Sequence, residues 1–233
     1  MQLPVTILRP EGLRADLSEV MRILGYKAGT TRLEPRHVAL VEAGIRLAEA
    51  NAAPVVSLAY TDVRVSPDVV EAARVDLTWH SRSLARLLKE AAGVTLIAAT
   101  LGPGIEQETE RLFKAGDYAL ATAVDAAGSV LVHALCGKAQ AYLCEQLQGL
   151  ALTPIFGPGY GDWEIEDQRR LTQAAGGPAI GLTCTEACYL SPQKSLAGIT
   201  GWLKPGAGQS WAEACTLCTK PDCAYRAVPA RAR

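Results

Sequence analysis

The sequence lacks an excess of charge of either sign. Its 233 residues include 23 Lys and Arg against 24 Asp and Glu, which gives a formal net charge of −1, and no long run of either charge occurs. Proteins that bind a nucleic-acid backbone or an anionic membrane surface usually carry a basic patch. The composition therefore argues against nucleic acid and membrane as partners.

A secretory signal and a long apolar run are missing as well. The first ten residues, MQLPVTILRP, have no basic region followed by a long apolar region. The apolar run at 91–101 ends at Gly102-Pro103-Gly104, short of the ~20 apolar residues that cross a bilayer. We therefore expect a cytoplasmic protein without a membrane-spanning segment.

What is present is the composition of a folded protein, with 49% hydrophobic and 20% charged residues. At this length folding removes roughly 70% of the chain's surface from water, so a core forms without disulfides. One large domain or two small ones are expected. No G-x-x-x-x-G-K-[ST] phosphate loop and no Rossmann-type glycine pattern within a βαβ unit occur.

Hydrophobic periodicity and breaking residues predict the secondary structure. They predict strands over 5–8, 55–65 and 94–101, and helices over 17–24, 35–50, 80–92, 104–110 and 117–148. From Gly149 onward the chain becomes rich in Gly, Trp and Cys. Binding sites are often built from such loops, so we expect the functional residues there.

The first candidate motif is the segment 156–163, Phe-Gly-Pro-Gly-Tyr-Gly-Asp-Trp. Its glycines permit positive φ angles and close approach of a flat ligand to the backbone. Tyr160 and Trp163 offer faces for stacking or for holding a cation. A tight turn with an aromatic anchor is an equally good interpretation of the pattern.

The second motif is the segment 180–195, which reads as two extended stretches turned by Pro192. Glu186 lies among small and apolar neighbours, where a carboxylate needs a partner or a polar ligand. Lys194 is a candidate partner. The alternative is a Glu side chain that faces solvent from a strand.

The third motif is a C-x2-C-x4-C pattern formed by Cys215, Cys218 and Cys223. Such spacing can hold a metal ion through a tight turn, and Cys184, Cys188, a His or an outside ligand would complete a tetrahedral site. The spacing matches neither common ferredoxin pattern. A zinc ion or an iron–sulfur cluster is one interpretation, and reduced thiols or a reversible disulfide are the other.

Together these motifs resemble the reactivation domain of cobalamin-dependent methionine synthase, and the stand-alone proteins similar to that domain. The resemblance rests on stretches at 98–102, 124–129, 155–160, 182–186, 192–195 and 215–226. It implies one α+β domain over 1–233, with a twisted antiparallel sheet flanked by helices. Within it we expect a helical and strand region at 1–90, a core with the ligand loop at 91–210, and a Cys-rich tail at 211–233.

The resemblance also implies a binding site for S-adenosylmethionine. In that family the adenosyl ligand lies on an Arg-x-x-Pro-Gly-Tyr segment, and Ile155 replaces the arginine here. The implied cofactor-binding residues are Phe156, Gly157, Pro158, Gly159, Tyr160, Thr185 and Glu186. No catalytic acid or base is implied, because the chemistry needs binding and orientation.

The function implied is reactivation, in trans, of a corrinoid methyltransferase or a methionine synthase core that lacks its own reactivation domain. The protein would bind S-adenosylmethionine and support reductive methylation of the cob(II)alamin held by that partner. One alternative is an iron–sulfur electron-transfer protein that reduces a corrinoid protein. Another is a non-catalytic module that binds a corrinoid protein and is stabilised by zinc.

Overall fold

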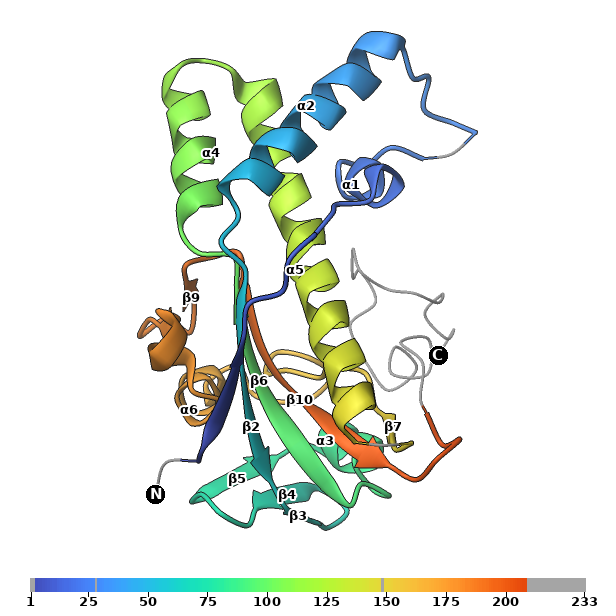
Figure 1. The fold of residues 1–233 in the computed structure, drawn as a ribbon, viewed down its shortest axis with the longest axis vertical. Helices are drawn as coiled ribbons and strands as arrows, with labels where there is room; N and C mark the ends of the chain where they lie inside the picture. The colour runs from blue at the N-terminus through green and yellow to red at the C-terminus, as the bar shows by residue number, and fades with distance from the viewer. Residues whose placement is uncertain (1–2, 28, 148, 209–233) are drawn as a thin grey trace.

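A five-stranded antiparallel sheet with the strand order β1-β2-β6-β10-β7 forms the centre of the fold (Figure 1). The structure is a computed structural model and describes residues 3–27, 29–147 and 149–208. The strands of this sheet are β1 (Val5–Leu8), β2 (Val55–Thr61), β6 (Gly93–Thr100), β7 (Ala151–Leu152) and β10 (Ser195–Leu203). The α+β class and the antiparallel sheet expected from the sequence are confirmed.

Six α-helices and one short 3-10 helix accompany the sheet in the part of the chain that the structure describes. They are α1 (Leu17–Ile23), α2 (Pro35–Asn51), α3 (Arg82–Leu87), α4 (Gly104–Lys114), α5 (Tyr118–Gln146), α6 (Asp167–Ala174) and η1 (Gly177–Ile180). Two smaller sheets are formed by β3 (Val63–Val65), β4 (Val69–Ala72) and β5 (Leu77–His80), and by β8 (Thr183–Cys184) and β9 (Leu190–Ser191).

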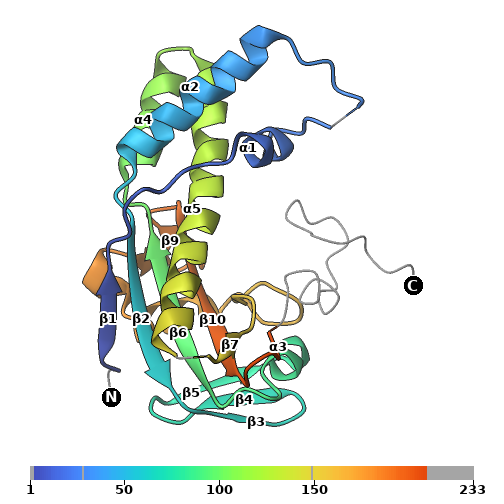
Figure 2. The ribbon, with the colours of Figure 1, turned by 45° about the vertical axis from the view of Figure 1, so that its right-hand side comes forward.

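Both faces of the central sheet are buried, which explains the unbroken apolar run of β6. Its residues alternate between two hydrophobic clusters, with Ile97 and Ala99 in one and Leu96 and Ala98 in the other. The first cluster is completed by α5 and the second by α3, α6 and the small β3-β4-β5 sheet. Figure 2 shows that α5 runs along the sheet and continues beyond it, where α2 and α4 pack against it.

The helix α5 is long and apolar enough to cross a membrane, with a mean hydropathy of 1.6 over its most apolar window. This average over a window is a different measure from the unbroken apolar run that the sequence expectation considered. However, 61% of the window is buried inside the fold, as in the core helix of a folded domain. Val124, Leu131 and Leu135 are fully buried and belong to the cluster between α5 and the sheet.

Close approach of α2 to α5 depends on a small residue. A Cβ atom placed on Gly44 would lie 2.6 Å from the Cβ of Ala123, closer than real Cβ contacts. Glycine in α2 and alanine in α5 therefore allow the two helix backbones to come together. Larger side chains at this crossing would push the helices apart.

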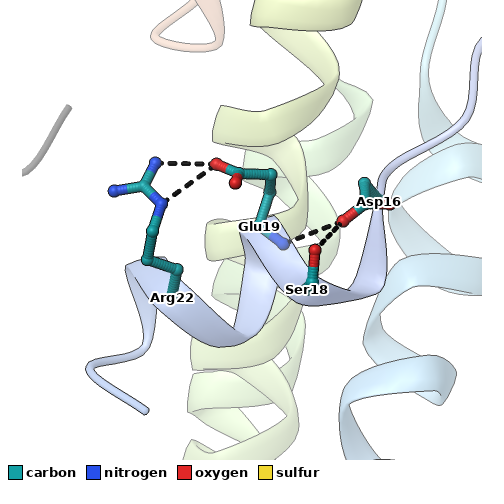
Figure 3. Close-up of polar contacts among 4 residues, drawn as sticks. All are labelled: Asp16, Ser18, Glu19 and Arg22. Atoms are coloured by element: carbon teal, nitrogen blue, oxygen red, sulfur yellow. Dashed lines mark hydrogen bonds and ion pairs between the residues drawn. The ribbon is translucent and has the colours of Figure 1, made fainter. Parts of the chain in front are cut away.

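The short helix α1 is held by polar contacts at its start (Figure 3). The Asp16 carboxylate is its N-cap and accepts hydrogen bonds from the Ser18 hydroxyl and from the Glu19 N–H, the latter at 3.0 Å. Arg22 forms an ion pair with Glu19 at 2.7 Å, three residues earlier in the same helix. These contacts satisfy a backbone donor that the first turn leaves unpaired.

The region 55–92 differs most from its predicted structure. The strand predicted over 55–65 is divided into β2 and β3, and the helix predicted over 80–92 is the shorter α3. Its leucines Leu84, Leu87 and Leu88 are buried, as their spacing indicated. After the helix the Ala92 N–H donates to the Trp202 carbonyl, so by this residue the backbone has joined the central sheet.

Cys136 provides a test of the core. Burial on α5 raises the pKa of its thiol to about 12. A thiol reagent at pH 8 is therefore expected to leave Cys136 unmodified in the folded protein, while it labels the exposed Cys144 on the same helix. Peptide mapping by mass spectrometry reads this out, with urea-unfolded protein as the control in which both cysteines react. Equal labelling in the folded state would contradict this placement of α5.

Candidate functional site

A cavity of about 290 Å³ lies between the loop before α6, the β8-β9 hairpin and the start of β10. Ile155, Gly157, Pro158, Tyr160, Ile165, Gln168, Cys188, Tyr189, Leu190, Gln193, Ser195, Leu196 and Ala197 line it. Three residues predicted from the sequence to bind a cofactor, Gly157, Pro158 and Tyr160, are therefore in its wall. The volume is near the lower end of the range for small-molecule sites, which begins at about 300 Å³.

The loop is fixed to β10 by backbone contacts. The Phe156 N–H donates to the Ile199 carbonyl at 2.9 Å, and the Ile199 N–H donates back at 2.8 Å. A Cβ atom on Gly157 would lie 2.7 Å from the Ala197 carbonyl oxygen. Only glycine fits here. Because it has no side chain, the loop backbone itself forms part of the cavity wall.

Aromatic residues anchor this loop from the side of the core. The Phe156 ring stacks on Trp163 with 6.3 Å between centroids, and it meets Tyr160 edge to face at 5.6 Å. Phe156 and Trp163 are each only 2% exposed, whereas Tyr160 is 37% exposed. The interpretation of Trp163 as a face for a ligand was therefore wrong, because the ring is part of the core and its Nε1 donates to Asp167. Phe156 lies behind the cavity wall.

Asp162 ties the loop to the start of α3. Its carboxylate accepts hydrogen bonds from the Ser81 hydroxyl at 2.7 Å, the Ser83 N–H at 2.9 Å and the Arg82 N–H at 3.0 Å. Gly161 has a φ of 58° and passes so close to Ser83 that a Cβ atom would lie 2.6 Å from its hydroxyl oxygen. The sequence Gly161-Asp162 thus joins the 156–163 loop to a helix eighty residues earlier.

These hydrogen bonds give Asp162 an unusual acidity. Desolvation acts to raise the pKa of the carboxyl, but the donors from Ser81, Ser83 and Arg82 together outweigh it and hold the pKa well below its ordinary value. A lowered pKa in the folded state means that the charged form adds stability above the unfolded pKa, near 4. That stability is lost as the pH falls toward the folded pKa.

We therefore expect the substitution Asp162→Asn to lower the free energy of unfolding by about 1 kcal/mol at neutral pH, because the amide lacks the charge that strengthens these hydrogen bonds. The difference from the wild type should shrink as the pH falls below about 4. Urea unfolding followed by circular dichroism between pH 3 and 7 measures this trend. Asp117→Asn, which changes the N-cap carboxylate of α5, is the matched control. A difference that is constant across this pH range would contradict the assigned role of Asp162.

The β8-β9 hairpin forms the outer wall. Thr185 shapes its turn, since its N–H donates to the Tyr189 carbonyl at 2.8 Å and its hydroxyl accepts from the Tyr189 N–H at 3.1 Å. Cys188 has a φ of 62°, a left-handed conformation uncommon for a residue with a side chain. Thr185 and Glu186 are exposed at the tip of the hairpin and outside the cavity lining. Their contact with a cofactor stays a prediction.

Lys194 fixes the other end of the hairpin. Its side chain is 10% exposed, and its Nζ lies 2.7 Å from the Asp125 carboxylate and 3.1 Å from the Ser129 hydroxyl on α5. Gly128 leaves room for the lysine stem, because a Cβ atom there would lie 3.1 Å from the Lys194 Cε. The expectation that Lys194 pairs with Glu186 was wrong, since the ion pair is made with the half-exposed Asp125.

Several lining residues were not identified from the sequence. Gln168 is in α6, Tyr189 precedes β9, Gln193 follows β9 and Ser195 begins β10, and tertiary packing brings them together. The Gln193 N–H donates to the Glu106 carboxylate of α4 at 2.9 Å, which fixes the backbone next to the cavity. The available signal was that Tyr189, Gln193 and Ser195 lie within the 180–195 motif, while Gln168 follows shortly after the 156–163 motif.

The proposed metal ligands Cys215, Cys218 and Cys223 lie outside the described residues. Among residues 3–27, 29–147 and 149–208, no group of three or more His, Cys, Asp or Glu side chains is arranged to hold a metal ion. Cys184 and Cys188 are free thiols in the hairpin. The metal and iron–sulfur hypotheses therefore stay predictions from the sequence.

Comparison with known proteins supports the fold. No family model matches the chain, and no curated protein matches it. Among solved structures, the chain is similar to the crystal structure of the MetH reactivation domain bound to AdoHcy, with a TM-score of 0.68 and 14% identity. The match covers 90% of this chain and 81% of that chain. The resemblance inferred from the sequence is thus confirmed at the level of the fold.

Proposed function

We propose that this protein binds S-adenosylmethionine in the cavity beside Tyr160 and uses it to reactivate, in trans, a corrinoid held by a methyltransferase partner. The observation that carries the proposal is the position of this cavity. It is built on the Pro158-Gly159-Tyr160 loop, the segment on which the sequence resemblance locates the adenosyl ligand, within a fold similar to a reactivation domain that binds AdoHcy.

The cavity wall suits an adenosyl group. Tyr160 and Tyr189 supply aromatic faces, and Gly157 exposes backbone that can approach a flat base. Gln168, Gln193 and Ser195 offer neutral donors and acceptors for a purine edge or ribose hydroxyls. A concave, mostly apolar site with a few polar groups is the usual form of a cofactor site.

In the proposed reaction a low-potential one-electron donor reduces the partner's cob(II)alamin, and the methyl group of the sulfonium is transferred to cobalt. The bond between sulfur and the methyl carbon breaks, the cobalt–carbon bond forms, and S-adenosylhomocysteine leaves as a neutral thioether. The chain's own residues bind the nucleoside, orient the sulfonium and exclude water. No acid or base is needed, because no proton is transferred.

The first test is calorimetric titration of anaerobically prepared protein with S-adenosylmethionine. We expect saturable binding that Tyr160→Ala weakens at least about tenfold, the scale set by loss of one stacked aromatic contact. Tyr118→Ala is the matched control, because Tyr118 is 65% exposed at the start of α5 and outside the cavity. An absence of binding to folded protein would refute the proposed cofactor.

The second test adds a corrinoid methyltransferase that lacks a reactivation domain, with its cofactor in the cob(II)alamin state and a chemical reductant present. We expect the visible spectrum to convert to that of the methylated corrinoid only with both this protein and S-adenosylmethionine. Tyr160→Ala should slow the conversion. If S-adenosylmethionine binds but the corrinoid spectrum does not convert, the protein acts as a binding module and reactivation of that partner is refuted.

A further inference from the structure

The cavity has a wall without charge. Its lining in the described part of the chain contains no Asp, Glu, Lys or Arg. The polar groups that do line it are neutral and include the side chains of Gln168, Gln193 and Ser195. Ile155, which is 1% exposed, lines the cavity at the position where the family that the sequence resembles carries an arginine.

Four charged side chains next to the residues that line the cavity are engaged elsewhere, and Glu186 is exposed at the tip of the hairpin, outside the lining. The Lys194 ammonium is paired with Asp125, and the Glu106 carboxylate accepts from the Gln193 N–H. The Arg169 guanidinium donates to the Thr185 carbonyl at 3.2 Å, and Asp167 accepts from the Trp163 indole at 2.9 Å. Redirecting any of them to a ligand would break a contact that holds the site together.

These observations bear on which part of the ligand is recognised. S-adenosylmethionine and S-adenosylhomocysteine end in a zwitterionic amino acid, whose carboxylate and ammonium gain little from a site without counter-charges. The adenosine part is neutral and gains from stacking and from neutral hydrogen bonds. A space of about 290 Å³ is also small for a cofactor site.

We infer that the cavity recognises 5′-thioadenosine nucleosides through the adenosine part, and that the amino-acid end contributes little to affinity. This inference rests on the proposed function, because it concerns the same site. It makes Ile155 a specificity-determining residue, since its apolar side chain lies where an arginine would provide a fixed partner for a carboxylate. Neutral nucleoside thioethers should then compete with the zwitterionic ligands.

The experiment compares S-adenosylhomocysteine with 5′-methylthioadenosine, which has the same adenosine thioether but a methyl group in place of the amino-acid chain. We expect the two dissociation constants from calorimetry to agree within about threefold, a difference below 1 kcal/mol. Raising the salt from about 50 to 500 mM should leave both nearly unchanged, because no ion pair is screened. Tyr160→Ala should weaken both by the same factor.

The outcomes separate this inference from the function on which it rests. If S-adenosylhomocysteine binds more than about tenfold tighter than methylthioadenosine, the inference is overturned and the proposed cofactor stands. The same conclusion follows if only S-adenosylhomocysteine loses affinity at high salt. If neither ligand binds the folded wild-type protein, both the inference and the proposed cofactor fail.

Discussion

Replacing Phe156 with Ala is expected to lower the free energy of unfolding by about 3–5 kcal/mol, the usual cost of removing a large buried aromatic side chain. Phe156 is 2% exposed, stacks on Trp163 and meets the edge of Tyr160. Its loss would leave a void between the loop and the hydrophobic cluster that includes Trp79. Urea unfolding, followed by tryptophan fluorescence, measures the change as a lower midpoint.

The same substitution should weaken binding of S-adenosylmethionine even where the protein remains folded. Phe156 does not line the cavity, but it holds the Tyr160 ring that does. Phe156→Leu keeps most of the volume and should restore much of the stability while the ring contact stays absent. Binding by Phe156→Leu that equals the wild type would show that Tyr160 does not depend on this contact.

Phe113→Ala is the matched control for these variants. Phe113 is 43% exposed at the end of α4 and touches the ring of Tyr118 rather than the core clusters. Its removal should change the free energy of unfolding by no more than about 0.5 kcal/mol, as exposed substitutions usually do. Comparable losses for Phe113→Ala and Phe156→Ala would contradict the assignment of Phe156 to the core.

The sequence predicted those elements whose hydrophobic pattern reflects one environment along the whole element. The apolar run of β6 predicted a strand buried on both faces, and all eight of its residues are buried. The stripe of apolar residues on α5 predicted a long core helix, and Gly149 follows close after its end. Long periodic segments constrain the structure strongly because many residues must agree.

The sequence could not predict the features that arise from contacts between distant segments. The strands β3, β4 and β5 are three to four residues long, too short to show a period. The sequence motif made Trp163 a candidate for stacking on a ligand, and only its packing against Phe156 in the structure shows that the Trp163 ring belongs to the core. Likewise, Glu186 is nearer to Lys194 in the sequence than Asp125 is, but packing against α5 brings the lysine side chain to Asp125.

The pair formed by Lys194 and Asp125 leads to the second large prediction. Asp125→Ala is expected to lower the free energy of unfolding by about 2 kcal/mol, because it leaves a mostly buried ammonium group without its carboxylate. The value is below that of a fully buried pair since Asp125 is 50% exposed, and because the Ser129 hydroxyl still contacts the Lys194 Nζ. Urea unfolding at neutral pH measures the change.

Lys194→Met should cost less than about 1 kcal/mol, because methionine keeps the apolar stem beside Gly128 and introduces no unpaired charge. The double variant should then have the same free energy of unfolding as Lys194→Met alone, since no unpaired ammonium group remains. Glu110→Ala is the control, as its pair with Lys114 is 3.5 Å long and both side chains are at least 70% exposed. Strict additivity of the two single changes would contradict the coupling.

The pair should also affect the cavity, because Gln193 and Ser195 line it on either side of Lys194. A stranded ammonium group would pull the segment between β9 and β10 toward water, so Asp125→Ala should weaken nucleoside binding several-fold. Lys194→Met should leave binding within about twofold of the wild type. These different responses of the two partners distinguish two roles for Lys194, positioning of the cavity wall and direct electrostatic contact with the ligand. In the latter case, removal of the lysine charge would cause the larger loss.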